Sequence, residues 1–589
     1  MLSGASHTVR RSLLELLAAL GLGLVLAVVW TWPLLPSLGT ALPYDPVAAG
    51  PVGSDMHIWT WNFWWAGQVA AGVEAPFHSD AIFLPVGHSL VFHTHSFFWG
   101  LLTLPVQWAF GVPAAVGLAL LLLPASAFAA AWALARDLGT SRAGACVTAF
   151  GWAFAPYFLQ KGLEHLAFVA TPWPPLLVLF LLRWMAAPAG TGWRPALGAG
   201  VVVGLGLLSG SLVGMYLVVL GGLVVLVAPK AAEGVEHRTA PGRLALLDGP
   251  ALLLFLGSAV VLAWPLLSEL RAESASLARA AASGAAAGEA LLGREVGVRT
   301  ALVDFLRLAP LHPLGTPPAD APPGWNEVSS LHLSAALLVL GALALRGARH
   351  LRGWVVLFLV GFLLTWDPVV AEADGGLFSS LYRRLPGLDA LRIPARSWPL
   401  ALLPLAVLGG LGWDRLRASS RPTAAVLALV LVAESWTRSL PLMDVTPPPA
   451  VEVLAATDRR PADGVLTLPV QPGASRAMTW QTRHGRPVVF SYVARANPRA
   501  TLLWMHAAPD LFAVMVPRVT PAGAVQVPDP RALAIDLAGL GVGDVLVDVE
   551  GLGAGAPALL GLLGELLDGM PGWERQEVEG PVAWWRRVA

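Results

Sequence analysis

Residues 113–135 read PAAVGLALLLLPASAFAAAWALA and contain no charged side chain. About 20 apolar residues in a helix are enough to cross the hydrocarbon core of a bilayer. Only helices and closed barrels satisfy their backbone in that core, and this run lacks the two-residue alternation of a barrel strand. The run therefore predicts a transmembrane helix, and similar runs follow along the chain.

The composition of the whole chain fits a polytopic membrane protein. Hydrophobic residues make up 56% of the 589 residues and charged residues only 13%, whereas soluble proteins carry roughly 25% charged residues. We count about eleven candidate spans by the length that a bilayer requires. They cover approximately residues 12–34, 113–135, 143–158, 167–185, 195–208, 211–228, 244–264, 333–345, 353–366, 397–413 and 423–437. The first is expected to be an uncleaved helix, because it lacks a clear small-residue cleavage site.

Arginine and lysine in the short loops predict the orientation of these spans. Basic residues fall in alternate loops, beginning with Arg10 and Arg11 and continuing with Arg136 and Arg142. This pattern places the N-terminus on the cytoplasmic side of an inner-membrane-type protein. The outer side then receives 35–96, 159–166, 265–332, 367–396 and the tail. The apolar stretch 97–111 would reverse every later loop if it spanned, so we expect a re-entrant or interfacial helix there.

The tail has a different character from the rest of the chain. A Pro-rich linker at Val445–Pro449 precedes short β-like runs at 464–470, 487–493 and 544–549, with helical stretches at 530–540 and 556–567. The predicted architecture is therefore an α-helical membrane domain over 1–440 and an outer α/β domain over 441–589. An Ala-rich helix is expected at 274–290, in the outer loop 265–332. The terminal Trp584-Trp585 fits a last strand or a membrane-surface contact.

The first outer loop, within 35–112, holds the leading candidate for a catalytic residue. Gly53-Ser54-Asp55 opens a predicted helix with four Trp residues in seven positions. Because Trp favours the membrane–water interface, this helix is expected to lie along the outer surface, with the Asp55 carboxylate near headgroup depth. The simpler alternative is that Asp55 only caps the helix and the Trp residues only anchor it. The loop also contains His78, His88, His93 and His95, which are expected to be loop or packing residues and not metal ligands.

Two further clusters carry charge next to predicted spans. The second outer loop contains Lys161, Glu164 and His165, and charges so near the membrane are costly unless they are paired or used. Before a later span, Arg392 and Arg396 are four residues apart, and guanidinium groups grip phosphate bidentately. The alternatives are a salt bridge at the loop end for the first cluster, and general contact with lipid headgroups or with the tail for the second.

Several function classes find no support in the sequence. The basic residues are scattered and the net charge is zero, which argues against nucleic-acid binding. The single Cys146 excludes an intrachain disulfide. No Walker loop, zinc-spaced Cys/His set, nucleophile elbow or dinucleotide fingerprint is present.

The ordered set of motifs resembles the GT-C superfamily of polytopic glycosyltransferases, which includes protein O-mannosyltransferases and aminoarabinose transferases. The resemblance covers most of 1–440. After the first helix and its acidic loop, the motifs in chain order are Gly53-Ser54-Asp55, Ala133-Leu134-Ala135-Arg136-Asp137-Leu138-Gly139, Ala155-Pro156-Tyr157, Gly162-Leu163-Glu164-His165 and Leu391-Arg392-Ile393-Pro394-Ala395-Arg396. An outer domain after the last span completes the pattern.

The resemblance implies transfer of a sugar from a polyprenyl-phosphate donor to an unidentified acceptor at the outer face of the membrane. Asp55 matches the acidic residue that serves as catalytic base or metal ligand, although many members carry two adjacent acids where this chain has Ser54-Asp55. A divalent metal is an optional cofactor. The residues that these roles imply are Lys161, Arg392 and Arg396 for the donor phosphate, Asp55, Glu164 and His165 for a metal ion, and His57, Trp59, Asn62 and Tyr157 for the substrate lining.

Two other functions remain open at this stage. A non-catalytic scaffold could keep the fold and bind partners through its tail. A flippase for lipid-linked glycans is the third reading, although coupled carriers need polar groups near the bilayer midplane and the predicted spans contain very few charges.

Overall fold

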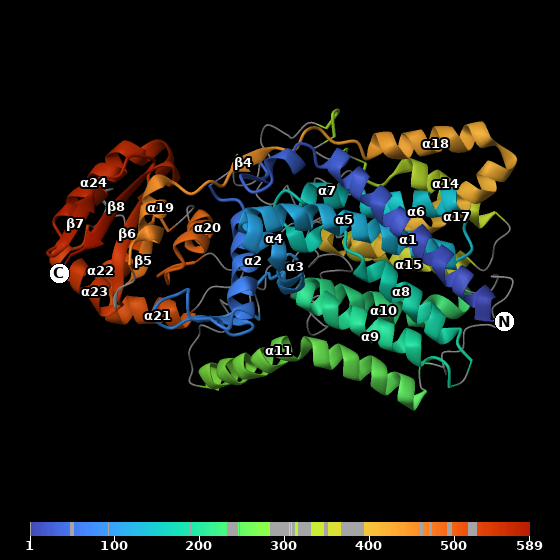
Figure 1. The fold of residues 1–589 in the computed structure, drawn as a ribbon, viewed down its shortest axis with the longest axis horizontal. Coiled ribbons are helices and arrows are strands. Elements are labelled where there is room, and N and C mark those ends of the chain that lie inside the picture. The colour runs from blue at the N-terminus through green and yellow to red at the C-terminus, as the bar shows by residue number, and fades with distance from the viewer. Residues whose placement is uncertain are drawn as a thin grey trace, which may run out of the picture. The chain divides into compact units, whose positions relative to one another are not determined.

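A computed structural model describes most of the chain. The described residues are 2–46, 52–91, 93–188, 190–231, 246, 248–282, 305–306, 308, 312–315, 331–346, 351–366, 394–458, 463–470, 474–491, 498–515 and 527–588. The chain forms two compact units (Figure 1). Unit 1 comprises Met1–Leu38, Gly117–Trp264 and Arg294–Leu442, and unit 2 comprises Gly39–Val116, Pro265–Gly293 and Met443–Ala589.

Unit 1 is built from helices in the ranges that the apolar runs predict. Two of its helices, α5 and α11, are shared with unit 2. The described helices are α1 (Leu2–Trp30), α5 (Val112–Asp137), α6 (Arg142–Ala153), α7 (Pro156–Lys161), α8 (Trp173–Met185), α9 (Trp193–Ser209), α10 (Ser211–Ala231), α11 (Gly249–Ala282), α14 (Ala335–Leu345), α15 (Arg352–Thr365), α17 (Pro399–Ser419) and α18 (Arg421–Glu434). Short 3-10 turns η1 (Leu35–Ser37), η2 (Leu166–Phe168) and η7 (Pro394–Ser397) lie between them.

Five helical segments among the described residues are long and apolar enough to cross a membrane: Ser12–Trp30, Val112–Asp137, Leu166–Met185, Gly249–Glu273 and Ala395–Ser419. In the segment of α5, 83% of the residues in its apolar stretch are buried in protein. In the segments of α1 and α11 that share is only 17%. Apolar side chains on helices so exposed require a lipid environment, because water would oppose them. The chain is therefore a helical membrane protein, and the count of about eleven spans stays a prediction.

The centre of unit 1 is a close crossing of α6 and α17. A Cβ atom on Gly410 would lie 2.1 Å from Thr148 Oγ1 and 2.5 Å from the Gly144 carbonyl oxygen. Only glycine permits backbones to approach this closely, as small residues do at helix crossings in membranes. At the start of α6, Ser141 Oγ accepts a hydrogen bond from Gly144 N at 3.1 Å, and Asp414 of α17 accepts one from Ser141 N at 2.6 Å.

Unit 2 combines the first loop with the tail around a four-stranded sheet. The strand order is β5-β6-β8-β7, and only the β5–β6 pair is parallel. Within the described residues the strands are β1 (Ala41–Pro43), β2 (His78–Ser79), β3 (His88–Ser89), β4 (Leu442–Asp444), β5 (Gly464–Leu468), β6 (Val542–Asp548), β7 (Trp573–Gln576) and β8 (Val582–Arg587). The helices of unit 2, apart from its shares of α5 and α11, are α2 (Met56–Ala70), α3 (Phe97–Leu102), α4 (Leu104–Phe110), α19 (Pro449–Ala456), α20 (Ala474–His484), α21 (Pro498–Ala507), α22 (Pro509–Met515), α23 (Pro530–Gly539) and α24 (Ala556–Asp568), with the 3-10 turn η8 (Glu550–Gly555).

Several predictions for single segments can be compared with the structure. The stretch 97–111 breaks into α3 and α4, which are too short to span a bilayer. The terminal tryptophans lie in strand β8, as one of the two alternatives predicts. The β-like run 487–493 is confirmed only in part: Val488 forms one parallel bridge to Val465, whose N–H donates to the Pro487 carbonyl oxygen at 2.8 Å, and 492–493 lie outside the described residues. Helix α11 continues to Ala282 instead of ending near 264, and the rest of the Ala-rich stretch, 283–290, lies outside the described residues.

Candidate functional site

The N-terminus of α2 carries Asp55, the sequence-predicted catalytic residue. Asp55 is the N-cap residue of α2 by position, with φ −66° and ψ −13°, but its side chain makes no capping hydrogen bond. Ser54 Oγ instead accepts a hydrogen bond from Met56 N at 3.2 Å. The capping alternative therefore belongs to Ser54, and the half-buried Asp55 carboxylate is not used in capping the helix.

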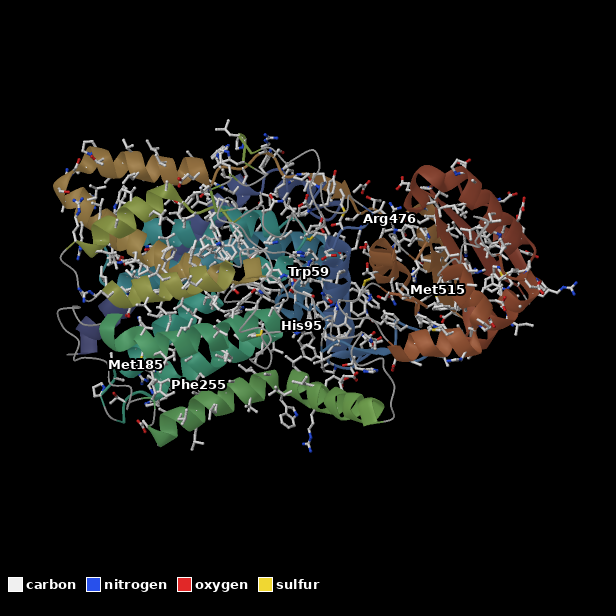
Figure 2. The ribbon with its side chains drawn as sticks, turned by 180° about the vertical axis from the view of Figure 1, so that it is seen from behind. Trp59, His95, Met185, Phe255, Arg476 and Met515 are labelled. Carbon is white, nitrogen blue, oxygen red and sulfur yellow. The ribbon has the colours of Figure 1, made fainter. Side chains whose placement is uncertain are left out.

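The four tryptophans of α2 are buried in protein. Trp59 is 1% exposed, Trp61 and Trp65 are 0% exposed and Trp64 is 7% exposed. The ring of Trp65 lies 6.3 Å from that of Trp61 in a stacked arrangement and 5.2 Å from that of Phe97 on α3. Figure 2 labels Trp59 on this helix. The expectation that these rings anchor α2 in lipid headgroups is therefore wrong, because burial in a protein core satisfies the same large apolar surface.

Two buried hydrogen bonds join α2 to α20, which lies beside it (Figure 1). His57 Nδ1 lies 2.8 Å from Thr479 Oγ1, and the Trp61 indole N–H donates to Gln481 Oε1 at 2.7 Å. Gln481 Nε2 donates in turn to the carbonyl oxygens of Ala81 and Arg486 at 2.6 and 3.1 Å. Sequence reasoning missed Thr479 and Gln481, because nothing in the local sequence of the tail indicates its partner helix.

Asn62, predicted to line the substrate site, is held by a second polar network in the first loop. Its Nδ2 donates to the carbonyl oxygen of Thr94 at 2.7 Å, so its Oδ1 accepts from His93 Nε2 at 3.0 Å. Burial lowers the pKa of His93 to about 3, and the neighbouring His88 and His95 add to the effect. Burial likewise lowers the pKa of His88 to about 4. His88 and His93 are therefore neutral at physiological pH.

The second charged cluster lies in unit 1, on and just after the short helix α7. Lys161 is 2% exposed and Glu164 is 5% exposed. The Lys161 ammonium lies 5.9 Å from the ring centre of Tyr157, which is fully buried. The His165 backbone N–H donates to the Lys161 carbonyl oxygen at 2.7 Å. Two buried charged residues three positions apart in the sequence are costly, and functional sites often retain such groups.

An apolar pocket opens in the same unit, next to Arg396. The cavity itself has a volume of about 30 Å³, and about 430 Å³ of space between atoms belongs to it when the open solvent at its entrance is included. The guanidinium carbon of Arg396, in the 3-10 turn η7, lies 4.9 Å from the ring centre of Phe168, and His165 contacts the same ring at 5.8 Å. The pocket is lined by Trp152, Phe158, Ala167, Phe168, Val169, Thr171, Pro174, Val213, Tyr216, Leu220, Pro399 and Leu400. A cation therefore lies against the wall of an apolar pocket.

The sequence-predicted site residues fall into two groups. Unit 1 holds Tyr157, Lys161, Glu164, His165 and Arg396, and unit 2 holds Asp55, His57, Trp59 and Asn62. Arg392 lies outside the described residues. Carboxylate and imidazole ligands suit a divalent cation, but across the described ranges no three His, Cys, Asp or Glu side chains form a metal-binding group. The metal set of Asp55, Glu164 and His165 stays a prediction.

Comparison with solved structures places this architecture among known folds. The mycobacterial arabinofuranosyltransferase AftD superposes on 98% of the chain with a TM-score of 0.52 and 16% sequence identity. The chain has the GT-C fold. It spans 40% of the AftD chain, so the likeness concerns the fold and not the whole of that protein. The GT-C fold expected from the sequence motifs is thereby confirmed.

Two other GT-C glycosyltransferases give weaker superpositions. ArnT from Cupriavidus metallidurans is 15% identical with a TM-score of 0.42, over 99% of this chain and 98% of ArnT. The oligosaccharyltransferase from Archaeoglobus fulgidus is 13% identical with a TM-score of 0.46, over 97% of this chain and 74% of that enzyme. No family model matches the chain, and no curated protein matches it by sequence.

Proposed function

We propose that the protein is a membrane glycosyltransferase that moves a sugar from a polyprenyl-phosphate donor to an acceptor hydroxyl at the outer face of the membrane. The observation that carries the proposal is the apolar pocket of unit 1 with Arg396 against its lining residue Phe168. A polyprenyl chain requires an apolar groove, and its phosphate requires a cation at the mouth. The GT-C fold supports the same class of reaction.

In this reaction the acceptor oxygen attacks the anomeric carbon of the donor sugar. Asp55 takes the proton of the acceptor hydroxyl as general base. The bond between the anomeric carbon and the phosphate oxygen breaks, and its electron pair leaves with the polyprenyl phosphate. Lys161 and Arg396 stabilise the negative charge that develops on this leaving group. Arg392 would add a third cation from the preceding segment.

The test uses the full chain in lipid nanodiscs with radiolabelled polyprenyl-phosphate pentoses and hexoses and a panel of envelope glycans as acceptors. We expect Asp55→Asn to abolish transfer while the protein still inserts and binds donor. Asp80→Asn is the matched control, because Asp80 belongs to the same loop and its side chain is 88% exposed. Full activity in the Asp55→Asn variant would overturn the assignment of the base, and no transfer from any donor by the wild-type chain would favour a scaffold.

A further inference from the structure

Asp55 is bracketed by hydrogen bonds from a single helix of the tail. Three residues before Asp55, the Val52 carbonyl oxygen accepts a hydrogen bond from Ser475 Oγ at 3.1 Å. Two residues after it, His57 Nδ1 lies 2.8 Å from Thr479 Oγ1. Ser475 and Thr479 are four residues apart on α20, so they project from one face of that helix. The chain is thus tied to α20 on both sides of Asp55, through the Val52 backbone and the His57 side chain.

A third tie fixes the rotation of α2. Trp61 follows His57 by four residues and donates to Gln481 Oε1 at 2.7 Å. The amide of Gln481 cannot turn freely, because its Nε2 donates to the carbonyl oxygens of Ala81 and Arg486. Two ties one helical turn apart, about 6 Å along the axis, prevent the helix from sliding or turning. A slip of one residue would swing Asp55 by about 100°.

All three α20 side chains are buried, which makes these ties costly to break. Ser475 is 2% exposed, Thr479 is 4% exposed and Gln481 is fully buried. A buried polar group that loses its partner destabilises that arrangement, so the bonded pose is strongly preferred over its neighbours. Helix α20 therefore supplies both the position and the rigidity of the segment around Asp55.

We propose that Ser475, Thr479 and Gln481 are positioning residues that hold the Asp55 carboxylate in its reactive pose, so that the tail forms part of the catalytic apparatus. The proposal rests on the proposed function of Asp55 as the base. A misplacement of about 1 Å at a reacting group can cost about 100-fold in rate. Loss of a tie should therefore lower kcat and leave the donor KM nearly unchanged, since donor binding is assigned to unit 1.

The first measurement is the kinetics of Thr479→Val and Gln481→Leu in nanodiscs. We expect kcat to fall by about 10- to 100-fold with the donor KM unchanged, and Thr479→Ser to restore most of the rate through its hydroxyl. Thr482→Val is the matched control, because the Thr482 hydroxyl bonds only to the Thr479 carbonyl oxygen of its own helix, at 2.7 Å. A wild-type kcat in both Thr479→Val and Gln481→Leu would overturn the proposal.

The second measurement needs no donor and so separates this proposal from the proposed function. In a Cys146→Ala background, Asp55→Cys is alkylated with a water-soluble maleimide, with and without Thr479→Val. We expect severalfold faster alkylation when the tie is lost and no change with Thr482→Val. If no sugar is transferred, an increased alkylation rate still supports the positioning by α20 and only the catalytic role of Asp55 falls. An unchanged rate overturns the positioning, whatever the activity.

Discussion

The guanidinium carbon of Arg396 lies 4.9 Å from the centre of the Phe168 ring, and Phe168 forms part of the wall of the apolar pocket in unit 1. Arg396 precedes α17 directly, in a 3-10 turn that begins with Pro394. Its charge is thus placed by a short rigid turn and an aromatic face. This geometry suits a cation that binds a phosphate beside an apolar pocket.

Replacement of Arg396 should weaken donor binding. Hydrogen bonds to charged groups contribute about 1.5–3 kcal/mol, so Arg396→Gln should raise the donor Kd by about 10- to 100-fold. Arg396→Lys should restore part of the affinity, since it keeps the charge but loses the bidentate grip. Binding of a fluorescent polyprenyl phosphate in nanodiscs measures the effect. The control is Arg352→Gln, an exposed arginine of the same unit, and equal affinities in both variants would contradict the assignment.

A bulky residue inside the pocket should exclude the lipid chain. Val213 lines the pocket and is 4% exposed, whereas Val218 on the same helix α10 is 64% exposed. Val213→Trp should therefore raise the KM for long-chain donors by at least about 10-fold, since the indole removes volume that a buried chain occupies. A donor analogue with a short prenyl chain should be much less affected. Val218→Trp is the control, and the same KM in both variants would show that the lipid lies elsewhere.

The stability of unit 2 should fall as the pH falls below 6.5. The pKa of His93 in the folded protein is about 3, below its ordinary value of 6.5. Between these values the unfolded chain binds a proton that the folded chain does not, so stability rises with pH and is lost on acidification. At pH 5.5 the loss for this group is on the order of 1 kcal/mol.

Thermal midpoints in detergent at pH 7.5, 6.5 and 5.5 measure this dependence. His93→Gln keeps an N–H donor for Asn62 but cannot titrate, so it should flatten the decline. His506→Gln, which changes an exposed histidine on α21, should leave the decline as in the wild type. The origin in His93 would be refuted by an equally steep decline in His93→Gln.

Asp544 should be essential to the stability of the tail sheet. Its buried carboxylate accepts hydrogen bonds from Arg586 Nε and Trp584 Nε1, both at 2.9 Å, and lies 3.5 Å from Arg486 Nη1. Asp544→Ala would leave buried guanidinium groups without this countercharge, at a cost of about 3–5 kcal/mol. We expect poor expression and a clearly lowered thermal midpoint. Glu574 occupies an exposed position of β7, so Glu574→Ala should change the thermal midpoint little. Similar midpoints for the two variants would contradict the stabilising role of Asp544.

Apolar periodicity predicts the helices of unit 1 well, because a bilayer admits few alternatives to a helix. The run 195–208, for example, corresponds to α9 at Trp193–Ser209. The surroundings of α2 could not be predicted in the same way. A helix rich in Trp suits both a membrane interface and a protein core, and only tertiary structure decides between them. Gln481 lies 420 residues after Trp61, so no local pattern connects them.

The charged residues of the candidate site could be predicted from the sequence. The pocket and the hydrogen-bond partners around them could not. Lys161, Glu164 and Arg396 stand out because charges beside apolar runs are rare. The pocket could not be predicted from the sequence, because lining residues such as Val213 and Leu400 do not differ in type from other apolar residues of the spans. The lack of a side-chain cap at Asp55 is equally hidden, because the motif Ser54-Asp55 offers two suitable capping groups.

The pairing of α2 with α20 also has a consequence for synthesis. A ribosome that has completed α2 must add about 400 more residues before α20 exists, which takes roughly 20–80 s at about 5–20 residues per second. During that interval the Trp61 indole lacks its hydrogen-bond partner Gln481 on α20. The newly made helix therefore needs a temporary host, such as a chaperone or the lipid surface itself, and a stalled or truncated chain would present this aggregation-prone segment permanently.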